Sequence, residues 1–455
     1  MQQPHPRQPR PRLRRMPVLR RSRAVWMSKH VWRPRLVFWM GALLVGVVGV
    51  VFAKLADWAQ GAFADLQAVP TLGSVATLLV PPLGFALSSF LVLRYFPNSG
   101  GSGIQQAIAA DSFESDADRD RLLSPRVAFG KIVLTLLGFL SGASIGREGP
   151  TVQIGAAIML AAGRLGGMVQ ARGLILAGSA AGIAAAFNTP IAGIVFAIEE
   201  MARAYESRIN GLVISTVILT GLASLALAGD YTYFGVSEAS VSSASDWMLV
   251  PLCGVLGGAL GALFSAGALA LIRLVRRWTR DKPGRIVWIA AACGAIVALV
   301  GFLSGGTTFG TGYEAARSAI EGDTLPPLFF LGKFLAGLAS MVSGIPGGIF
   351  APSLAVGAGL GSTIGLVTGA SAALAAMLGM AGYFAGAVQS PMTAFVIILE
   401  MTGNHTSVVP VMLAALLGFG TARLISDAPL YHSLARDCVA DILRQKRAGE
   451  AGRPA

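Results

Sequence analysis

The dominant pattern along the chain is a series of long apolar runs separated by short polar connections. Uncharged or nearly uncharged runs recur at 36–53, 71–93, 127–146, 149–163, 173–198, 209–229, 247–272, 286–313 and 325–332, followed by a charge-free stretch at 334–399 and a last run at 407–422. About 20 apolar residues are enough to cross a bilayer as a helix. The pattern therefore predicts an all-α, multi-pass membrane protein.

The polar segments divide this chain into one membrane domain with short tails. We expect a basic tail over residues 1–35, a transmembrane domain over 36–440 and a second tail over 441–455. Within the domain, the polar connection at 230–246 separates two halves, at 36–229 and 247–440.

Composition agrees with the apolar pattern. Hydrophobic residues make up 54% of the chain, charged residues only 13%, and the mean hydropathy is +0.65, whereas soluble domains carry roughly 25% charged residues. These values exclude a soluble enzyme, a disordered scaffold and a secreted disulfide-bonded domain. The cysteines and histidines show no pairing or metal-ligand spacing, so we expect neither a metal site nor a cofactor. They are Cys253, Cys293, Cys438, His5, His30, His405 and His432.

The positive charge is concentrated at the ends of the chain. Residues 1–36 hold ten Arg, one Lys and no acid, so they carry +11 of the formal +13 and leave only +2 for the rest. Basic residues beside a first apolar run indicate the cytoplasmic side and also contact anionic lipid. We interpret the tail in this way and do not expect nucleic acid as a partner. Because the last residues are basic too, we expect both termini to be cytoplasmic, with an even number of crossings of the cell (inner) membrane. The run at 36–53 lacks a cleavage site, so we expect it to be retained.

Several apolar runs are interrupted by residues that a straight spanning helix does not need. The interruptions are GREGP at 146–150, FNTP at 187–190, GIPGG at 344–348 and QSP at 389–391. Broken backbone within a membrane is tolerated where it is buried in protein or lines a polar cavity. The breaks therefore predict half-length or re-entrant helices around a transport pathway.

The breaks also repeat along the chain. Residues 181–201 resemble 381–401 at an offset of 200, which aligns Glu200 with Glu400, although Pro190 and Pro391 then need a one-residue gap. The upstream breaks at 146 and 344 are offset by 198. Chance similarity between two Ala-Gly-rich helices is the alternative to an internal duplication. Paired broken helices in two halves indicate a substrate site near the midplane.

Few carboxylates lie in or next to the long apolar runs, and such residues are costly in a membrane unless they are used. They are Glu148, Glu199, Glu200 and Glu400. Glu148 could serve a helix N-terminus or pair with Arg147, or it could occupy an anion site when ionised and leave it when protonated. Glu199, Glu200 and Glu400 could equally be charged helix ends at the membrane surface.

Three glycine-rich segments could present backbone N–H groups to an anion. They lie at 100–104, 146–150 and 347–352. A helix N-terminus binds anions through unpaired donors and the positive end of the helix dipole, without a formal cation. Each segment alone could be a tight turn, but three in one chain favour an anion pathway.

These motifs together resemble the CLC chloride channel/transporter family. The resemblance is carried by GSGIQ at 101–105, GREGP at 146–150, GGIFAP at 347–352 and Tyr431 in PLYHSL, and it covers roughly residues 36–440. It implies two inverted repeats of tilted, broken helices, and a homodimer with a separate pore in each subunit.

The resemblance also implies roles for particular residues. Ser102, Tyr431 and the backbone amides of Ile349 and Phe350 would bind chloride. Glu148 would be the external gate and proton acceptor. Glu200 would be the internal proton-transfer residue. Relatives that prefer nitrate carry proline where Ser102 stands.

The expected function is therefore exchange of chloride for protons. The alternative is a passive, proton-gated chloride channel of the same fold, whose members typically carry an uncharged residue in place of Glu200. Glu199 remains a rival for the role of Glu200. A membrane enzyme would need a nucleophile–base pair or metal ligands in the apolar region, and we do not expect one.

Two features depart from the family pattern. Gln105 replaces the proline of GSGIP, which adds a backbone donor and loosens the turn. The chain ends soon after Tyr431, so we expect no paired CBS domains, as in prokaryotic members.

Overall fold

The computed structural model describes residues 29–70, 72–202, 211–229 and 231–451, and all regular secondary structure in them is helical. The helices are α2 (Lys29–Ala68), α3 (Leu72–Arg94), α4 (Ile104–Ser112), α5 (Asp116–Leu122), α6 (Pro125–Leu140), α7 (Glu148–Gly166), α8 (Ala171–Phe187), α9 (Pro190–Phe196), η1 (Ala197–Ala202), α10 (Gly211–Ala228), α11 (Ala244–Thr279), α12 (Arg285–Leu303), α13 (Tyr313–Glu321), α14 (Phe329–Val342), α15 (Phe350–Thr368), α16 (Ala372–Val388), α17 (Pro391–Thr402), α18 (Val408–Ile425) and α19 (Leu430–Ala451). The all-α fold class predicted from the apolar runs is confirmed.

The helices differ widely in length. Within the described residues, seven helical segments are long and apolar enough to cross a membrane, and five further apolar helices have only 10–17 residues. The shorter ones include α8, α14, α16 and α17. The interrupted runs of the sequence therefore form broken helices, as predicted.

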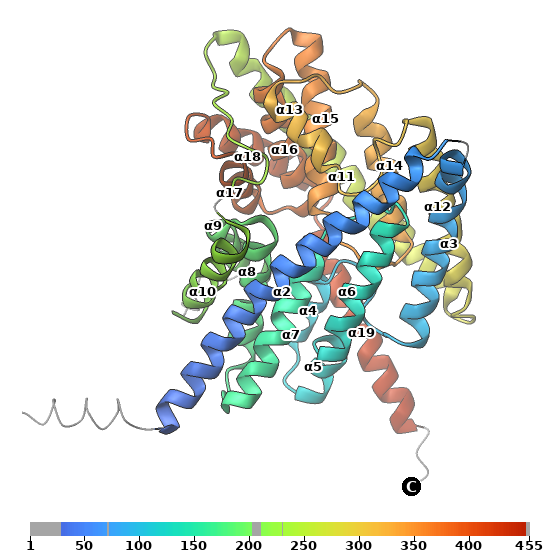
Figure 1. The fold of residues 1–455 in the computed structure, drawn as a ribbon, viewed down its shortest axis with the longest axis vertical. Helices are drawn as coiled ribbons and strands as arrows, with labels where there is room; N and C mark the ends of the chain where they lie inside the picture. Colours follow the sequence, from blue (N-terminus) through green and yellow to red (C-terminus); the bar gives the residue numbers. More distant parts are fainter. Residues whose placement is uncertain (1–28, 71, 203–210, 230, 452–455) are drawn as a thin grey trace, which may run out of the picture.

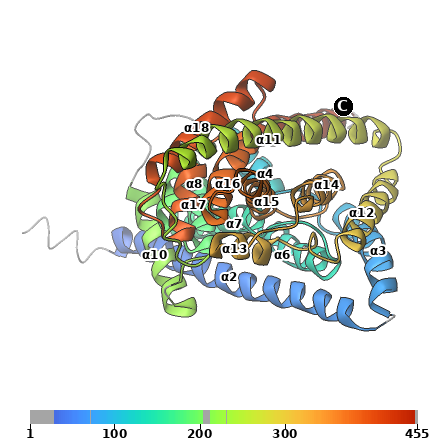
Figure 2. The ribbon, with the colours of Figure 1, turned by 90° about the horizontal axis from the view of Figure 1, so that it is seen from above.

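Long helices enclose a centre of shorter ones. Figure 2 shows α4, α7, α15 and α16 in the middle, with α2 along one side and α11 along the opposite side. In Figure 1, α7 runs downward and α15 upward from the centre of the molecule, so their N-terminal ends face each other there.

The two halves of the chain contain equivalent helices. α7 and α15 both have 19 residues, α8 and α16 both have 17, and α4 and α13 both have 9. Their starts are offset by 202 for α7 and α15 (148 to 350) and by 201 for α8 and α16 (171 to 372). The predicted register of 200 is therefore wrong by one or two residues, because the many Ala and Gly positions align almost equally well in neighbouring registers.

Glycine allows the central helices to pack at very short distance in both halves. A Cβ on Gly155 of α7 would lie 2.3 Å from the backbone oxygen of Gly178 on α8. A Cβ on Gly379 of α16 would likewise lie 2.3 Å from the oxygen of Gly357 on α15. Small residues at such crossings allow the close contacts on which helix packing in lipid depends.

The two predicted breaks after α8 and α16 also share one geometry. Asn188 and Gln389 end these helices in the left-handed conformation, with φ of 57° and 61°. Pro190 and Pro391 then begin α9 and α17. Proline suits a first helical position because its missing N–H has no partner there in any case.

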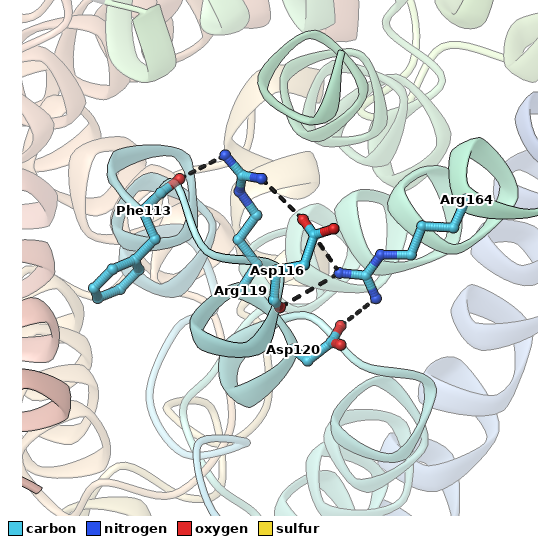
Figure 3. A network of polar contacts seen from close by, with 5 residues as sticks. All are labelled: Phe113, Asp116, Arg119, Asp120 and Arg164. Carbon is cyan, nitrogen blue, oxygen red and sulfur yellow. Dashed lines mark hydrogen bonds and ion pairs between the residues drawn. The ribbon is translucent and has the colours of Figure 1, made fainter. Parts of the chain in front are cut away.

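The acidic connection at 111–126 contains a short helix, α5, that the sequence analysis did not predict. Arg119 donates to the oxygen of Phe113 (2.6 Å) and pairs with Asp116 (3.0 Å). Arg164 near the end of α7 bonds the carboxylate of Asp120 (Figure 3). These contacts fix α5 against the end of α7.

Candidate functional site

Backbone pairing joins the three glycine-rich segments at the centre of the protein. Gly146 and Gly348 exchange two hydrogen bonds, each 2.7 Å long, as an isolated antiparallel bridge. Gly101 donates to the oxygen of Gly344 (3.1 Å) and accepts from Gly347 (3.1 Å). The starts of α4, α7 and α15 are therefore held together, although more than 200 residues separate the first from the last.

None of these three helix starts is capped by the side chain of its N-cap residue. The N-cap residues are Gly103, Arg147 and Ile349, and none makes a side-chain capping bond. By contrast, Ser124 and Ser371 cap α6 and α16. The first N–H groups of an uncapped helix require another acceptor. Three such ends in one buried place form a site suited to an anion.

Glu148 is the first residue of α7 and its side chain is fully buried. Glycine has no Cβ, but a Cβ placed on Gly146 would lie 2.1 Å from the Glu148 Oε2, and one placed on Gly348 would lie 3.4 Å from it. The carboxylate therefore lies directly over the bridge between these two glycines. The carboxylate faces the backbone N–H groups of Glu148 and Ala351, but neither of its oxygens makes a hydrogen bond of ordinary geometry. An ionisable, buried side chain therefore lies where the starts of α7 and α15 meet, close to their backbone N–H groups.

Ser102 and Tyr431 place two hydroxyl groups beside Glu148. Ser102 precedes α4 and is 3% exposed, and Tyr431 on α19 is fully buried. The Tyr431 hydroxyl is directed towards Ser102, yet neither hydroxyl makes a hydrogen bond of ordinary geometry. The Ser102 Oγ would lie 2.2 Å from a Cβ on Gly149, so glycine at that position leaves it the space it occupies.

The start of α15 completes this group of donors. Ile349 and Phe350 are buried, and the Phe350 ring lies 6.0 Å from that of Tyr431 and 4.7 Å from that of Phe384. The predicted anion-binding residues thus come from three separate parts of the chain: the segment before α4, the start of α15 and the start of α19. We call this group, made of Ser102, Ile349, Phe350 and Tyr431, the central donor cluster.

Arg147 does not form an ion pair with Glu148. Its Nη1 donates to the oxygen of Ala53 (3.1 Å) and to Asp57 (2.9 Å) on α2, and its guanidinium lies over the Tyr233 ring at 5.6 Å. Arg147 therefore anchors the start of α7 to α2. It lines a cavity of about 840 Å³ together with Asp57, Tyr231 and Tyr233.

Glu200 lies in η1, a π-helical turn that continues α9, and is fully buried. Ser390 donates to its Oε2 (2.5 Å). His432 Nε2 lies 2.8 Å from the Glu200 backbone oxygen and 3.8 Å from Oε1. Tyr431 lies within electrostatic reach of both Glu148 and Glu200, so one residue of the central donor cluster is near both carboxylates.

Glu199 faces a different partner from Glu200. Its carboxylate accepts from the N–H groups of Met392 (3.0 Å) and Thr393 (2.6 Å), in the first turn of α17. Glu400 at the end of α17 does the same for the first turn of α9, accepting from Ile191 and Ala192. The structural counterpart of Glu400 is therefore Glu199, which corrects the predicted alignment of Glu400 with Glu200. The reciprocal contact also makes α9 and α17 antiparallel, as inverted repeats require.

Gln105 occupies the second position of α4 and is 7% exposed. Its Nε2 would lie 2.5 Å from a Cβ on Gly101, which has a φ of 68°. Gly103, with a φ of 110°, still forms the N-cap of α4. With Gln105 in place of proline, α4 begins at Ile104, directly after Ser102 and Gly103.

Three buried polar side chains that bind helix-start loops or a carboxylate were not predicted from the sequence. Lys131 donates to the oxygen of Gly101 (2.7 Å), and Lys333 donates to that of Gly310 (2.7 Å). Ser390 binds Glu200 as described. Single cations inside otherwise apolar runs were the available signal for the lysines. No group of three or more metal-ligating side chains occurs in the described part of the chain.

The fold and the central site define a multi-pass membrane protein built to pass anions. The family model "Voltage gated chloride channel" matches residues 84–423. The H(+)/Cl(-) exchange transporters ClcA of Salmonella paratyphi A and Salmonella typhimurium are each 30% identical to this chain, over 93% of the chain and 92% of theirs. A slow cyanobacterial Cl-/H+ antiporter matches with a TM-score of 0.77 at 26% identity, covering 90% of this chain and 98% of that one.

A CLC-type fluoride/proton antiporter shares the fold, with a TM-score of 0.73 at 22% identity over 88% of this chain and 96% of that one. The chain thus belongs to the CLC chloride channel/transporter family, a family of anion transport proteins and not of enzymes.

Proposed function

We propose that this protein exchanges chloride for protons across the cell membrane. The observation that carries the proposal is the unpaired, buried carboxylate of Glu148 where three uncapped helix starts meet. Ionised, Glu148 occupies the site that backbone N–H groups would otherwise offer to an anion. Protonated, it loses its attraction to those donors, leaves, and admits chloride.

The central donor cluster would bind the anion between the two carboxylates. The hydroxyls of Ser102 and Tyr431 and the N–H groups of Ile349 and Phe350 supply neutral donors, which hold an anion without the tight binding of a fixed cation. Anion and proton then compete for one position, and this competition couples their movements.

Glu200 would receive protons on the other side of the cluster. A carboxylate buried in a membrane protein is costly unless its titration is used. Its partners Ser390 and His432 are polar and could pass protons, whereas Glu199 serves the start of α17. This geometry supports Glu200 over Glu199 for internal proton transfer, and the presence of a carboxylate here supports the exchanger over a passive proton-gated channel.

We further propose a homodimer with one pore per subunit in the inner membrane, with both termini cytoplasmic. The relatives named above support the exchanger, and the basic segment 1–36 supports the orientation. The first described residues of α2 and the end of α19 both lie at the lower margin of Figure 1, which agrees with two termini on one side. The proposed domain limits, 36–440 for the membrane domain between tails at 1–35 and 441–455, fall within α2 and α19.

The experiment is paired measurement of chloride and proton flux by the purified protein in liposomes. A chloride gradient should drive protons uphill, against their own gradient. Chloride flux with no proton movement would instead favour the passive channel. Replacing chloride with fluoride in the same assay tests the anion, since a fluoride/proton antiporter shares the fold.

A further inference from the structure

His432 connects the buried Glu200 with the surface of the protein. Its side chain is 22% exposed, whereas that of Glu200 is 0% exposed. The imidazole Nε2 lies 2.8 Å from the Glu200 backbone oxygen and 3.8 Å from its Oε1. One ring therefore reaches from the accessible surface to the carboxylate.

We propose that His432 is a proton-transfer residue that carries protons between the aqueous phase and Glu200. The inference rests on the proposed function, in which Glu200 exchanges protons. Histidine is suited to this role because its charge changes near neutral pH and its ring has two nitrogens that can hold a proton.

The backbone contact fixes which nitrogen carries the proton at rest. A carbonyl oxygen only accepts hydrogen bonds, so Nε2 must donate to the Glu200 oxygen and Nδ1 is the basic nitrogen. When a proton moves from water to Glu200, Nδ1 first takes it up and the ring becomes an imidazolium. The Nε2–H bond then breaks as an O–H bond forms on Oε1, which leaves a neutral ring protonated at Nδ1. Exchange with water, in which Nδ1 loses its proton and Nε2 takes one up, restores the starting form.

Ser390 and His432 approach different oxygens of the Glu200 carboxylate. The Ser390 hydroxyl donates to Oε2 of Glu200 at 2.5 Å, whereas Oε1 is the oxygen placed 3.8 Å from His432. A small rotation of either side chain closes that distance to the ~3 Å needed for direct proton transfer.

The charges around His432 are compatible with both of its protonation states. Arg436 lies one turn further along α19, where it donates to Ser433. Of the helices packed against α19, α11 contributes Arg276, which pairs with Asp437 and Asp441. α4 carries one charged residue, at its end (Asp111), and α16 carries none. Among the described residues, the Glu200 carboxylate lies within ion-pair distance of the ring.

A structural role is the competing explanation, because the ring also satisfies the backbone oxygen of Glu200. His432→Gln separates the two roles. The glutamine amide can still donate to that oxygen, but it cannot carry an additional proton near neutral pH. His405→Gln is the matched control, since His405 is an exposed histidine between α17 and α18.

The test measures chloride-driven proton flux in liposomes with and without imidazole. Imidazole is a small buffer whose neutral form crosses membranes and can replace a missing histidine in proton transfer. We expect His432→Gln to lower proton flux about tenfold or more and to lower the number of protons moved per chloride. Millimolar imidazole should restore proton flux in His432→Gln and leave the wild type and His405→Gln unchanged.

Two results would overturn the inference. Wild-type proton flux in His432→Gln would show that protons reach Glu200 by another route. A loss of both fluxes in constant proportion, with no recovery in imidazole, would show a structural role. Should the glutamine variant not fold, as judged by size-exclusion chromatography, His432→Asn gives the same readout. A wild type that moves no protons at all would instead overturn the proposed function, and it is recognised without any variant.

Discussion

Lys131 and Lys333 occupy equivalent positions in the two halves of the protein, and each binds the same type of loop. Lys131 on α6 donates to the oxygen of Gly101, three residues before α4 begins. Lys333 on α14 donates to the oxygen of Gly310, three residues before α13 begins. Both side chains are fully buried. The duplication thus repeats a buried lysine that donates to a loop, and only the first copy lies beside Ser102.

This difference predicts unequal effects of the same substitution. Lys131→Met removes a buried donor from the loop that holds Ser102, so the loop loses a fixed hydrogen bond and chloride affinity should fall by roughly three- to tenfold. Lys333→Met makes the same chemical change away from the central donor cluster and should leave chloride affinity near that of the wild type. Isothermal titration with chloride measures both. Equal affinity in the two variants would contradict the assignment of the anion site to the first loop.

The contacts of Glu199 and Glu400 predict a matched pair of stability effects. Each carboxylate accepts two hydrogen bonds from the start of the partner helix, which is a favourable place for negative charge. Replacing either with alanine should cost about 1–2 kcal/mol, as loss of a helix cap does, and should lower the thermal unfolding midpoint in detergent. Glu114→Ala, at an exposed position, is the control. A stable Glu199→Ala beside a destabilised Glu400→Ala would contradict the equivalence of the two caps.

The hydroxyl of Ser102 in the central donor cluster leads to a prediction about which anion is transported. This hydroxyl can donate to a small spherical anion, and proline at this position removes that donor. We expect Ser102→Pro to shift the ratio of nitrate to chloride flux towards nitrate. Ser99→Ala is the control, because Ser99 donates to Phe96 and not to the central donor cluster. Unchanged nitrate and chloride fluxes in Ser102→Pro would remove Ser102 from the anion site.

The proposed gating by Glu148 leads to a prediction about the pH dependence of chloride flux. Glu148→Gln resembles the protonated side chain and cannot titrate, so chloride should pass at every pH while proton movement stops. Chloride flux measured between about pH 3 and 7.5, on either side of the ordinary range for a carboxyl group, should then become flat. Glu400→Gln makes the same change where the carboxylate caps α9, and it should retain proton coupling. Persistent uphill proton movement in Glu148→Gln would contradict the gate.

Much of the central site could be predicted because its chemistry is local in sequence. GREGP places a carboxylate at the start of α7, and GGIFAP places a proline at the third position of α15. Each motif alone therefore indicates a helix start whose first backbone N–H groups are not capped by a side chain. The breaks at 187–190 and 389–391 were likewise visible as polar and proline residues within apolar runs. These elements depend on neighbouring residues and not on tertiary contacts.

The remaining features depend on contacts between distant parts of the chain. His432 and Glu200 are separated by 232 positions, and nothing around His432 in the sequence indicates that they meet. The correspondence of Glu199 with Glu400 required the hydrogen bonds to α17 and α9, because the Ala-Gly pattern does not fix the register. Lys131 is visible in the sequence as a single basic residue in an apolar run, but its partners are backbone oxygens, which the sequence does not identify.

The most direct test of the exchange mechanism is uphill proton movement driven by a chloride gradient in Glu200→Gln, measured beside the wild type and Glu199→Gln. Glu200 is buried between Ser390 and His432, whereas Glu199 binds the start of α17. We predict that the wild type pumps protons, that Glu200→Gln conducts chloride without proton movement, and that Glu199→Gln still pumps at a reduced rate. Proton pumping by Glu200→Gln at the wild-type rate would contradict the mechanism.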